Sequence, residues 1–149
     1  QFQQHTSTGQ SCQRAGEMDA AIAAYEAARA LYLGDFLAED RFAPWAIPQR
    51  RALQNEYRDM LANLAESYAA MGRYSNAIDA GQAALEVDPL LESVYRQLMR
   101  YHFCAGDKGG ALKVYRNCAK LFDELFGEGP TPQTKHLFET ISQNAELNC

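Results

Sequence analysis

The stretch LAESYAAMGRYSNAI, at Leu64–Ile78, decides the fold because its pattern of small and apolar residues returns farther along the chain. Aligning Gly72 with Gly106 shifts the sequence by 34 residues. The shift places residues of like character on one another, at Ala77 and Ala111, Ala84 and Cys118, and Leu64 and Leu98. An earlier copy of the same positions lies at Gly16, Ala21, Tyr25 and Ala28. The chain is therefore built from internal repeats.

A 34-residue period is that of the tetratricopeptide repeat, in which each unit is a pair of antiparallel helices. A glycine at the turn between the two helices adopts a positive φ without steric cost. Small residues let the helices approach closely, and large apolar residues fill the space between units. We therefore predict an all-α fold, a right-handed stack of antiparallel helix pairs.

About seven helices are predicted, and we expect them to form one domain over residues 1–149. Their expected ranges are 2–15, 17–32, 49–71, 74–86, 90–105, 108–126 and 131–145. Asp88 is expected to cap the helix that begins near residue 90, with Pro89 in its first turn. Thr131 and Pro132 form a similar start for the last helix, which is predicted to cap the stack at about residues 131–145.

An insertion separates the first two units. The distance from Gly16 to Gly72 is 56 residues, which exceeds one period by 22. The excess lies at about residues 32–51, where we expect Gly34 to end one helix and Pro48 to open the next. The insertion is rich in large apolar residues, namely Phe36, Leu37, Phe42 and Trp45. We expect these side chains to pack back on the helices, and we favour that role for Trp45 over an anchor for a partner.

The chain is acidic, with 14 Lys and Arg residues against 19 Asp and Glu residues and a net charge of -5. Because binding to a phosphate backbone depends on Lys and Arg, we do not expect this chain to bind nucleic acid directly. No apolar stretch approaches the roughly 20 residues that span a bilayer, so no membrane contact is expected. The N-terminus lacks the regions of a secretion signal and an initiator Met. We expect a fragment of a longer, cytoplasmic protein.

No motif for catalysis, a cofactor or a metal stands out. The four cysteines form no C-x-x-C pair, and their spacing does not predict a disulfide framework. Zinc needs three or four converging ligands, so we interpret His102 as a core-lining side chain near two buried thiols, Cys104 and Cys118. The run at residues 106–110 lacks the residue order of a phosphate-binding loop and is interpreted as a turn between helices. We therefore predict that the chain is not an enzyme.

Four stretches together carry a resemblance to a known family. They are ALYLGDFLAEDRFAPWAIPQR at Ala30–Arg50, LAESYAAMGRYSNAI at Leu64–Ile78, DPLLESVYRQLMRYHFCAGD at Asp88–Asp107 and ALKVYRNCAKLFDELFGEGPTPQT at Ala111–Thr134. The chain closely resembles the bacterial transcriptional activator domain of SARP-type regulators, from about Phe2 to Ile141. A generic tetratricopeptide protein lacks both the G-D-F-L insertion and the G-x2-P-x-P-x-T tail.

The resemblance implies a regulatory role. In that family the helical domain follows an N-terminal winged-helix domain that binds DNA, and it supports oligomerisation and transcriptional activation. The implied partners are proteins: other domains of the same regulator, a second subunit in a homo-oligomer, or the transcription machinery. Two alternatives stay open, a stand-alone peptide-binding adaptor and a sensor of a small effector.

The resemblance also places a groove on the first helix of each pair, at its second, fifth and ninth positions. These positions are Asp59, Ala62 and Glu66 in one unit and Ser93, Arg96 and Arg100 in the next. Like charges at Arg96 and Arg100 repel on one helix face unless an acid neutralises them. We favour an internal partner, Asp59 or Glu66, over an acidic segment of another domain or subunit. The candidate partner-binding residues are Asp59, Glu66, Arg96 and Arg100.

Overall fold

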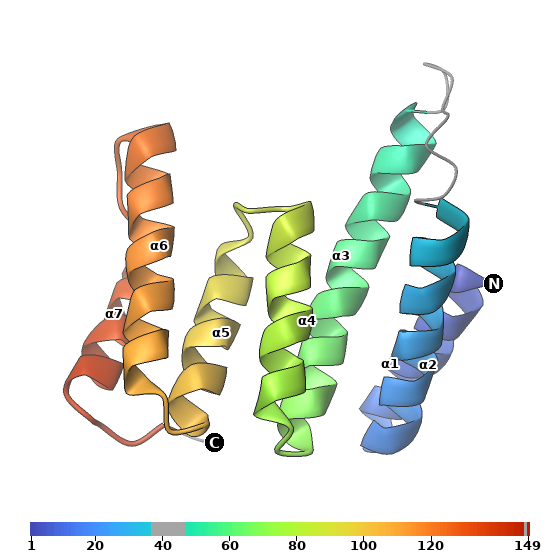
Figure 1. The fold of residues 1–149 in the computed structure, drawn as a ribbon, viewed down its shortest axis with the longest axis horizontal. Helices are drawn as coiled ribbons and strands as arrows, with labels where there is room; N and C mark the ends of the chain where they lie inside the picture. The colour runs from blue at the N-terminus through green and yellow to red at the C-terminus, as the bar shows by residue number, and fades with distance from the viewer. Residues whose placement is uncertain (37–46, 148) are drawn as a thin grey trace.

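The computed structural model of the chain describes residues 1–36, 47–147 and 149. The described residues form seven α-helices and one short π-helix, with no strand among them. The α-helices are α1 (Phe2–Arg14), α2 (Met18–Leu31), α3 (Ile47–Ala70), α4 (Tyr74–Val87), α5 (Glu92–Cys104), α6 (Lys108–Phe126) and α7 (Pro132–Ser142). Figure 1 shows them in a row, from α1 and α2 at one end to α6 and α7 at the other. The predicted all-α stack of helix pairs is confirmed.

The turns inside the three helix pairs have the same geometry. Gly16, Gly72 and Gly106 have φ of +80°, +73° and +87°. In each turn the amide after the glycine donates to the carbonyl five residues earlier, at 2.8 Å from Glu17 to Cys12, 2.9 Å from Arg73 to Tyr68 and 2.8 Å from Asp107 to His102. These bonds satisfy carbonyls that the helix end leaves without a partner. The 34-residue offset therefore identified equivalent turns correctly.

The small residues of the repeat lie at the helix crossings. No side-chain surface remains exposed at Ala21, Ala77, Ala84, Ala111 and Cys118. Large side chains fill the space around them, among which Tyr25, Met60, Leu61, Leu64 and Leu98 are almost wholly buried. One further small position, Gly81, was not singled out from the sequence. A Cβ there would lie 2.7 Å from Leu98 Cδ2, so α4 and α5 also cross at close range.

The beginning of the insertion differs from the prediction. The chain does not end its helix at Gly34 but continues beyond α2 as the π-helix η1 (Tyr32–Phe36). Pro48 is the second residue of α3, as expected for a proline in a first turn. Leu37, Phe42 and Trp45 fall outside the residues that the structure describes.

The predicted cap at Asp88 is wrong. Helix α5 begins at Glu92, four residues later, and its N-cap residue is Leu91. Asp88 instead ends α4 and accepts a hydrogen bond from the amide of Leu90 at 3.0 Å. Its second oxygen lies 3.1 Å from Arg58 Nη1 on α3. Asp88 is therefore the C-cap residue of α4 and lies three residues before the N-cap position of α5.

The start of the last helix is partly as predicted. Thr131 is the N-cap residue of α7, and Pro132 occupies its first position. The Thr131 side chain does not cap α7 itself but donates to Glu92 on α5. Helix α7 ends at Ser142, three residues before the predicted end.

Two predictions were wrong, namely that Cys104 is a buried free thiol and that His102 lines the core. Cys104, at the end of α5, forms a disulfide with Cys149, while Cys12 and Cys118 are free. The chain after α7 returns to the lower end of α5, where Figure 1 marks the C-terminus. His102 does not line the core against Cys118, because its Nδ1 lies 3.1 Å from Asp107 Oδ2 at the turn. Asp107 also accepts a hydrogen bond from the amide of Gly110 and so caps α6, as the interpretation of residues 106–110 as a turn requires.

Candidate functional site

A hollow with a volume of about 590 Å³ lies where α3, α4 and α5 meet. It brings together two of the four predicted groove residues, Glu66 from α3 and Arg100 from α5. Its other walls come from Ala69, Ala70, Tyr74, Gln97, Tyr101, Cys104 and Cys149. We call this feature the α3–α5 hollow. Its size is within the range of small-ligand sites, roughly 300–1,000 Å³.

One wall of the α3–α5 hollow is held in place by hydrogen bonds from Gln97. The Gln97 amide donates to Tyr101 Oη at 2.9 Å and to the Ala62 carbonyl at 3.4 Å. Tyr101 is buried, and its ring lies 6.5 Å from that of Tyr74, centre to centre. Burial raises the pKa of Tyr101 to about 12, and the charge of Glu66 acts in the same direction. The phenol is therefore neutral at physiological pH.

Glu66 and Arg100 share this hollow without pairing. Both side chains are exposed. Among the residues that the structure describes, neither one forms an ion pair. Within the residues described, the hollow thus carries one unpaired carboxylate from α3 and one unpaired guanidinium from α5.

Arg96 has a different environment. Its guanidinium donates to Glu92, at 3.3 Å, and to the Thr134 hydroxyl, at 3.0 Å. Thr134 is completely buried and also donates to Glu92. Arg96 is therefore held between α5 and α7.

Glu92 is the centre of this arrangement. Its carboxylate accepts hydrogen bonds from the Thr131 amide at 3.1 Å, from both threonine hydroxyls and from Arg96. Burial alone would raise the pKa of Glu92, but the bonds from Thr131 and Thr134 and the charge of Arg96 outweigh it and lower that pKa. An ionised Glu92 at the N-terminus of α7 also interacts favourably with the helix dipole.

Asp59 lies in a second, smaller hollow between α1 and α3. This hollow has a volume of about 320 Å³ and is otherwise lined by Gln3, Thr6, Ser7, Gln10, Glu56 and Met60. Asp59 pairs with its neighbour Arg58, whose Nε lies 3.0 Å from the carboxylate. Asp59 and Glu66 thus face different hollows.

The predicted internal pairing across the repeat boundary is wrong. Within the described part of the chain, neither Asp59 nor Glu66 pairs with Arg96 or Arg100. Arg96 is neutralised by Glu92, four residues earlier on its own helix. That spacing, with the acid nearer the N-terminus, favours an ion pair on any helix. The i,i+4 spacing in the sequence therefore pointed to Glu92 as the partner of Arg96. Considering only the groove positions missed it, because Glu92 is not one of them.

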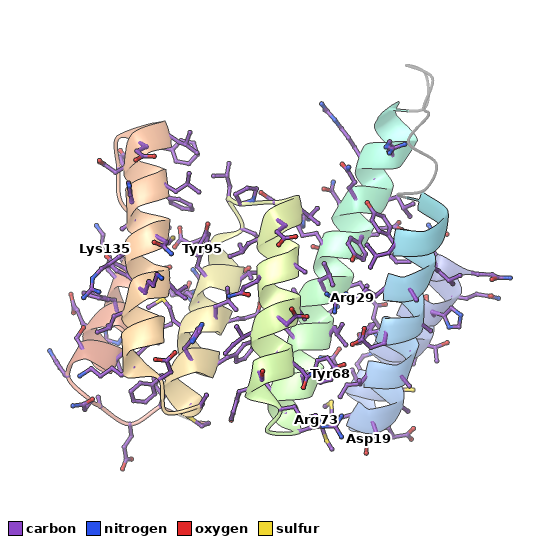
Figure 2. The ribbon with its side chains drawn as sticks, viewed as in Figure 1. Asp19, Arg29, Tyr68, Arg73, Tyr95 and Lys135 are labelled. Carbon is purple, nitrogen blue, oxygen red and sulfur yellow. A yellow bond between two sulfur atoms is a disulfide. The ribbon has the colours of Figure 1, made fainter. Side chains whose placement is uncertain are left out.

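A second polar cluster joins α2, α3 and α4. Arg29 lies 3.8 Å from Glu26 and 3.4 Å from Asp79, and the Tyr68 hydroxyl donates to Glu26. Figure 2 shows Arg29 and Tyr68 in the space between α2 and the pair α3 and α4. Burial raises the pKa of Tyr68 to about 12, with the hydrogen bond and charge of Glu26 adding to the effect. The charged groups of the cluster are paired with one another, and their contacts connect the first helix pair to the second.

The remaining reactive groups are dispersed. Over residues 1–36, 47–147 and 149, no three His, Cys, Asp or Glu side chains converge as a metal site. Burial raises the pKa of the Cys118 thiol to about 12, so this cysteine is protonated at neutral pH. None of the helices in the same residues is long and apolar enough to cross a membrane.

The equivalent turns and the close crossings define the class of the protein, a helical-repeat domain of the tetratricopeptide type. Within that class, the chain belongs to the bacterial transcriptional activator domain family, which its sequence matches over residues 1–142. The resemblance inferred from the four stretches of sequence is therefore confirmed. No curated protein matches the chain.

Two solved structures show the same fold. Mycobacterium tuberculosis EmbR, solved in complex with a low affinity phosphopeptide, matches 99% of this chain with a TM-score of 0.84 and 24% identity. The chain spans only 39% of EmbR. The Sgt2 TPR domain from Aspergillus fumigatus matches 96% of this chain, over 78% of its own length, with a TM-score of 0.65 and 23% identity. At these identities the likeness concerns the fold alone.

Proposed function

We propose that the chain is the regulatory and oligomerisation domain of a bacterial SARP-type transcriptional regulator and that it works through protein contacts. Family membership over residues 1–142 supports the transcriptional setting. DNA binding is supplied by an upstream winged-helix domain of the same cytoplasmic regulator. The net charge of -5 supports this division of labour, because an acidic domain is repelled by the phosphate backbone.

One observation carries the proposed contact surface. Glu66 on α3 and Arg100 on α5 line one hollow, and neither has an ion-pair partner within the described residues. The surface extends to Asp59, whose side chain is 63% exposed. Arg96, which the sequence also suggested, acts in this proposal as a positioning residue for α7. The partner is another domain of the regulator, a second subunit or the transcription machinery.

The test compares the full-length regulator with a version that lacks residues 1–142. We expect the shortened protein to bind a promoter fragment within about tenfold of the parent, because the winged helix alone contacts DNA. We expect reporter transcription to fall to the background level, because the protein contacts are lost. Unchanged transcription without this domain would refute the proposal.

The isolated chain provides the complementary measurement. A fluorescence anisotropy titration against the same promoter fragment at physiological salt should give no sequence-dependent binding. An unrelated fragment of equal length is the matched control. Sub-micromolar, sequence-dependent binding by this chain alone would contradict the assignment of DNA binding to another domain.

A further inference from the structure

We propose that the α3–α5 hollow binds a small zwitterion, a dipeptide-sized molecule with a free amino end, a free carboxyl end and an apolar body. The amino end would lie against the Glu66 carboxylate and the carboxyl end against the Arg100 guanidinium. The ligand would act as an effector of the domain. The role of the ligand as an effector rests on the proposed function. Its binding does not, because binding can be measured with the purified chain alone.

The first argument is the state of the charges. Other charged side chains nearby are paired, since Arg58 bridges Asp59 and Asp88, and Arg96 pairs with Glu92. Glu66 and Arg100 both line the hollow, and among the residues described neither one forms an ion pair. One group of each sign in a single hollow complements a molecule that carries both signs. A simple anion bound to Arg100 would be repelled by the like charge of Glu66. A simple cation bound to Glu66 would be repelled by Arg100.

The second argument is the chemistry of the walls. Besides the two charges, the hollow is lined by apolar and aromatic side chains, from Ala69, Ala70, Tyr74 and Tyr101. The Tyr101 phenol is neutral at physiological pH, and burial raises its pKa further, to about 12. Its orientation is fixed by Gln97, whose amide donates to it at 2.9 Å. A preformed apolar wall lowers the entropy cost of binding a small ligand.

The third argument concerns the size of the ligand. A hollow of about 590 Å³ has the volume of a small-molecule site, and it is roomier than a single amino acid needs. Cys104 and Cys149, joined by a disulfide, form one wall of the hollow at the end of α5. A dipeptide with a large apolar side chain satisfies the volume, the walls and both charges.

The probe is alanyl-phenylalanine, titrated by calorimetry into the purified, oxidised chain. Two capped versions of it, N-acetylated and C-amidated, each remove one charge of the ligand. We expect each cap to weaken binding about tenfold or more, the usual loss for one charge-assisted hydrogen bond. Absence of binding at millimolar concentration, or equal binding of all three versions, would overturn the proposal.

Two variants assign the ends of the ligand. In Glu66→Gln the acetylated and free dipeptides should bind equally, whereas the penalty for amidation should remain. In Arg100→Gln the amidated and free dipeptides should bind equally, whereas the penalty for acetylation should remain. The stated orientation would be refuted if Glu66→Gln removed the penalty for amidation and Arg100→Gln the penalty for acetylation. It would also be refuted if neither variant removed a penalty.

Matched controls come from α6, where Glu124 and Arg116 are exposed and do not line the hollow. Glu124→Gln and Arg116→Gln should bind all three dipeptides as the parent does. Circular dichroism and the thermal midpoint check that every variant is folded. Failure of dipeptide binding with intact reporter transcription refutes this inference alone, whereas loss of the proposed function shows in the reporter assay with the domain deleted.

Discussion

The carboxylate of Glu92 accepts a hydrogen bond from the backbone amide of Thr131, at 3.1 Å, across 39 residues of sequence. A side chain near the start of α5 thus satisfies an amide at the start of α7. The same carboxylate binds the hydroxyls of Thr131 and Thr134 and the guanidinium of Arg96. The G-x2-P-x-P-x-T tail therefore has a physical role, since its two threonines attach α7 to the last helix pair.

Glu92→Ala should lower the free energy of unfolding by about 2 kcal/mol, because it leaves the buried Thr134 hydroxyl and the partly buried Arg96 without their acceptor. Urea denaturation measures this change. Glu86→Ala, at an exposed position on α4, is the matched control and should stay within about 0.5 kcal/mol of the parent. Equal stability of the two variants would show that Glu92 does not hold α7.

The stability of the chain should fall in acid through the same residue. The folded-state pKa of Glu92 lies below its ordinary value of 4.5, so the ionised carboxylate stabilises the fold above about pH 4.5. That contribution is lost as the pH falls through the lower, folded-state pKa. Urea denaturation between pH 3 and pH 7 should therefore show a steeper loss for the parent than for Glu92→Gln, which cannot titrate. Parallel curves would refute the assignment.

The close crossing of α4 and α5 makes Gly81→Ala destabilising. The added methyl group would lie 2.7 Å from Leu98 Cδ2, inside contact distance, and relieving it should cost about 1–3 kcal/mol. Gly109→Ala is the control, because its methyl group would meet nothing nearer than 3.9 Å and should be neutral or slightly stabilising. Thermal melts that rank the two variants in the reverse order would contradict the crossing.

The repeat register makes a parallel prediction at the small residues. Ala77→Leu and Ala111→Leu each place a large side chain at a fully buried crossing and should cost about 1–3 kcal/mol. Ala70→Leu, on the exposed end of α3, controls for the substitution itself. Melting temperatures of the two buried variants that match the parent would mean that the repeats are aligned incorrectly.

Reduction should destabilise the chain through Cys104 and Cys149. The disulfide closes a segment with a sequence separation of 45 residues, and loss of such a cross-link typically costs about 2–4 kcal/mol. Chemical denaturation with and without a reductant measures the difference, which Cys149→Ser should abolish. Cys12→Ser, which removes a free thiol, should leave the difference intact. A stability independent of reductant would contradict this role.

The sequence by itself determined the helix pairs and their turns. A glycine at each turn and a small residue at each crossing are local requirements, so their 34-residue recurrence was sufficient to identify Gly72 and Gly106 as equivalent turn residues. The i,i+4 spacing of Glu92 and Arg96 was also readable, although the groove positions alone pointed elsewhere.

Only the tertiary structure decided how the charges and the sulfurs pair. Whether Asp59 meets Arg58 or a residue of the next unit depends on how α3 and α5 pack, and no local spacing encodes that packing. The disulfide between Cys149 and Cys104 forms because the residues after α7 return to α5, and that return depends on where α7 packs. Glu66 and Arg100 came to share one hollow for the same reason. Periodicity specifies which residues face a neighbouring helix, whereas the distance and orientation between helices follow from the packing of the whole stack.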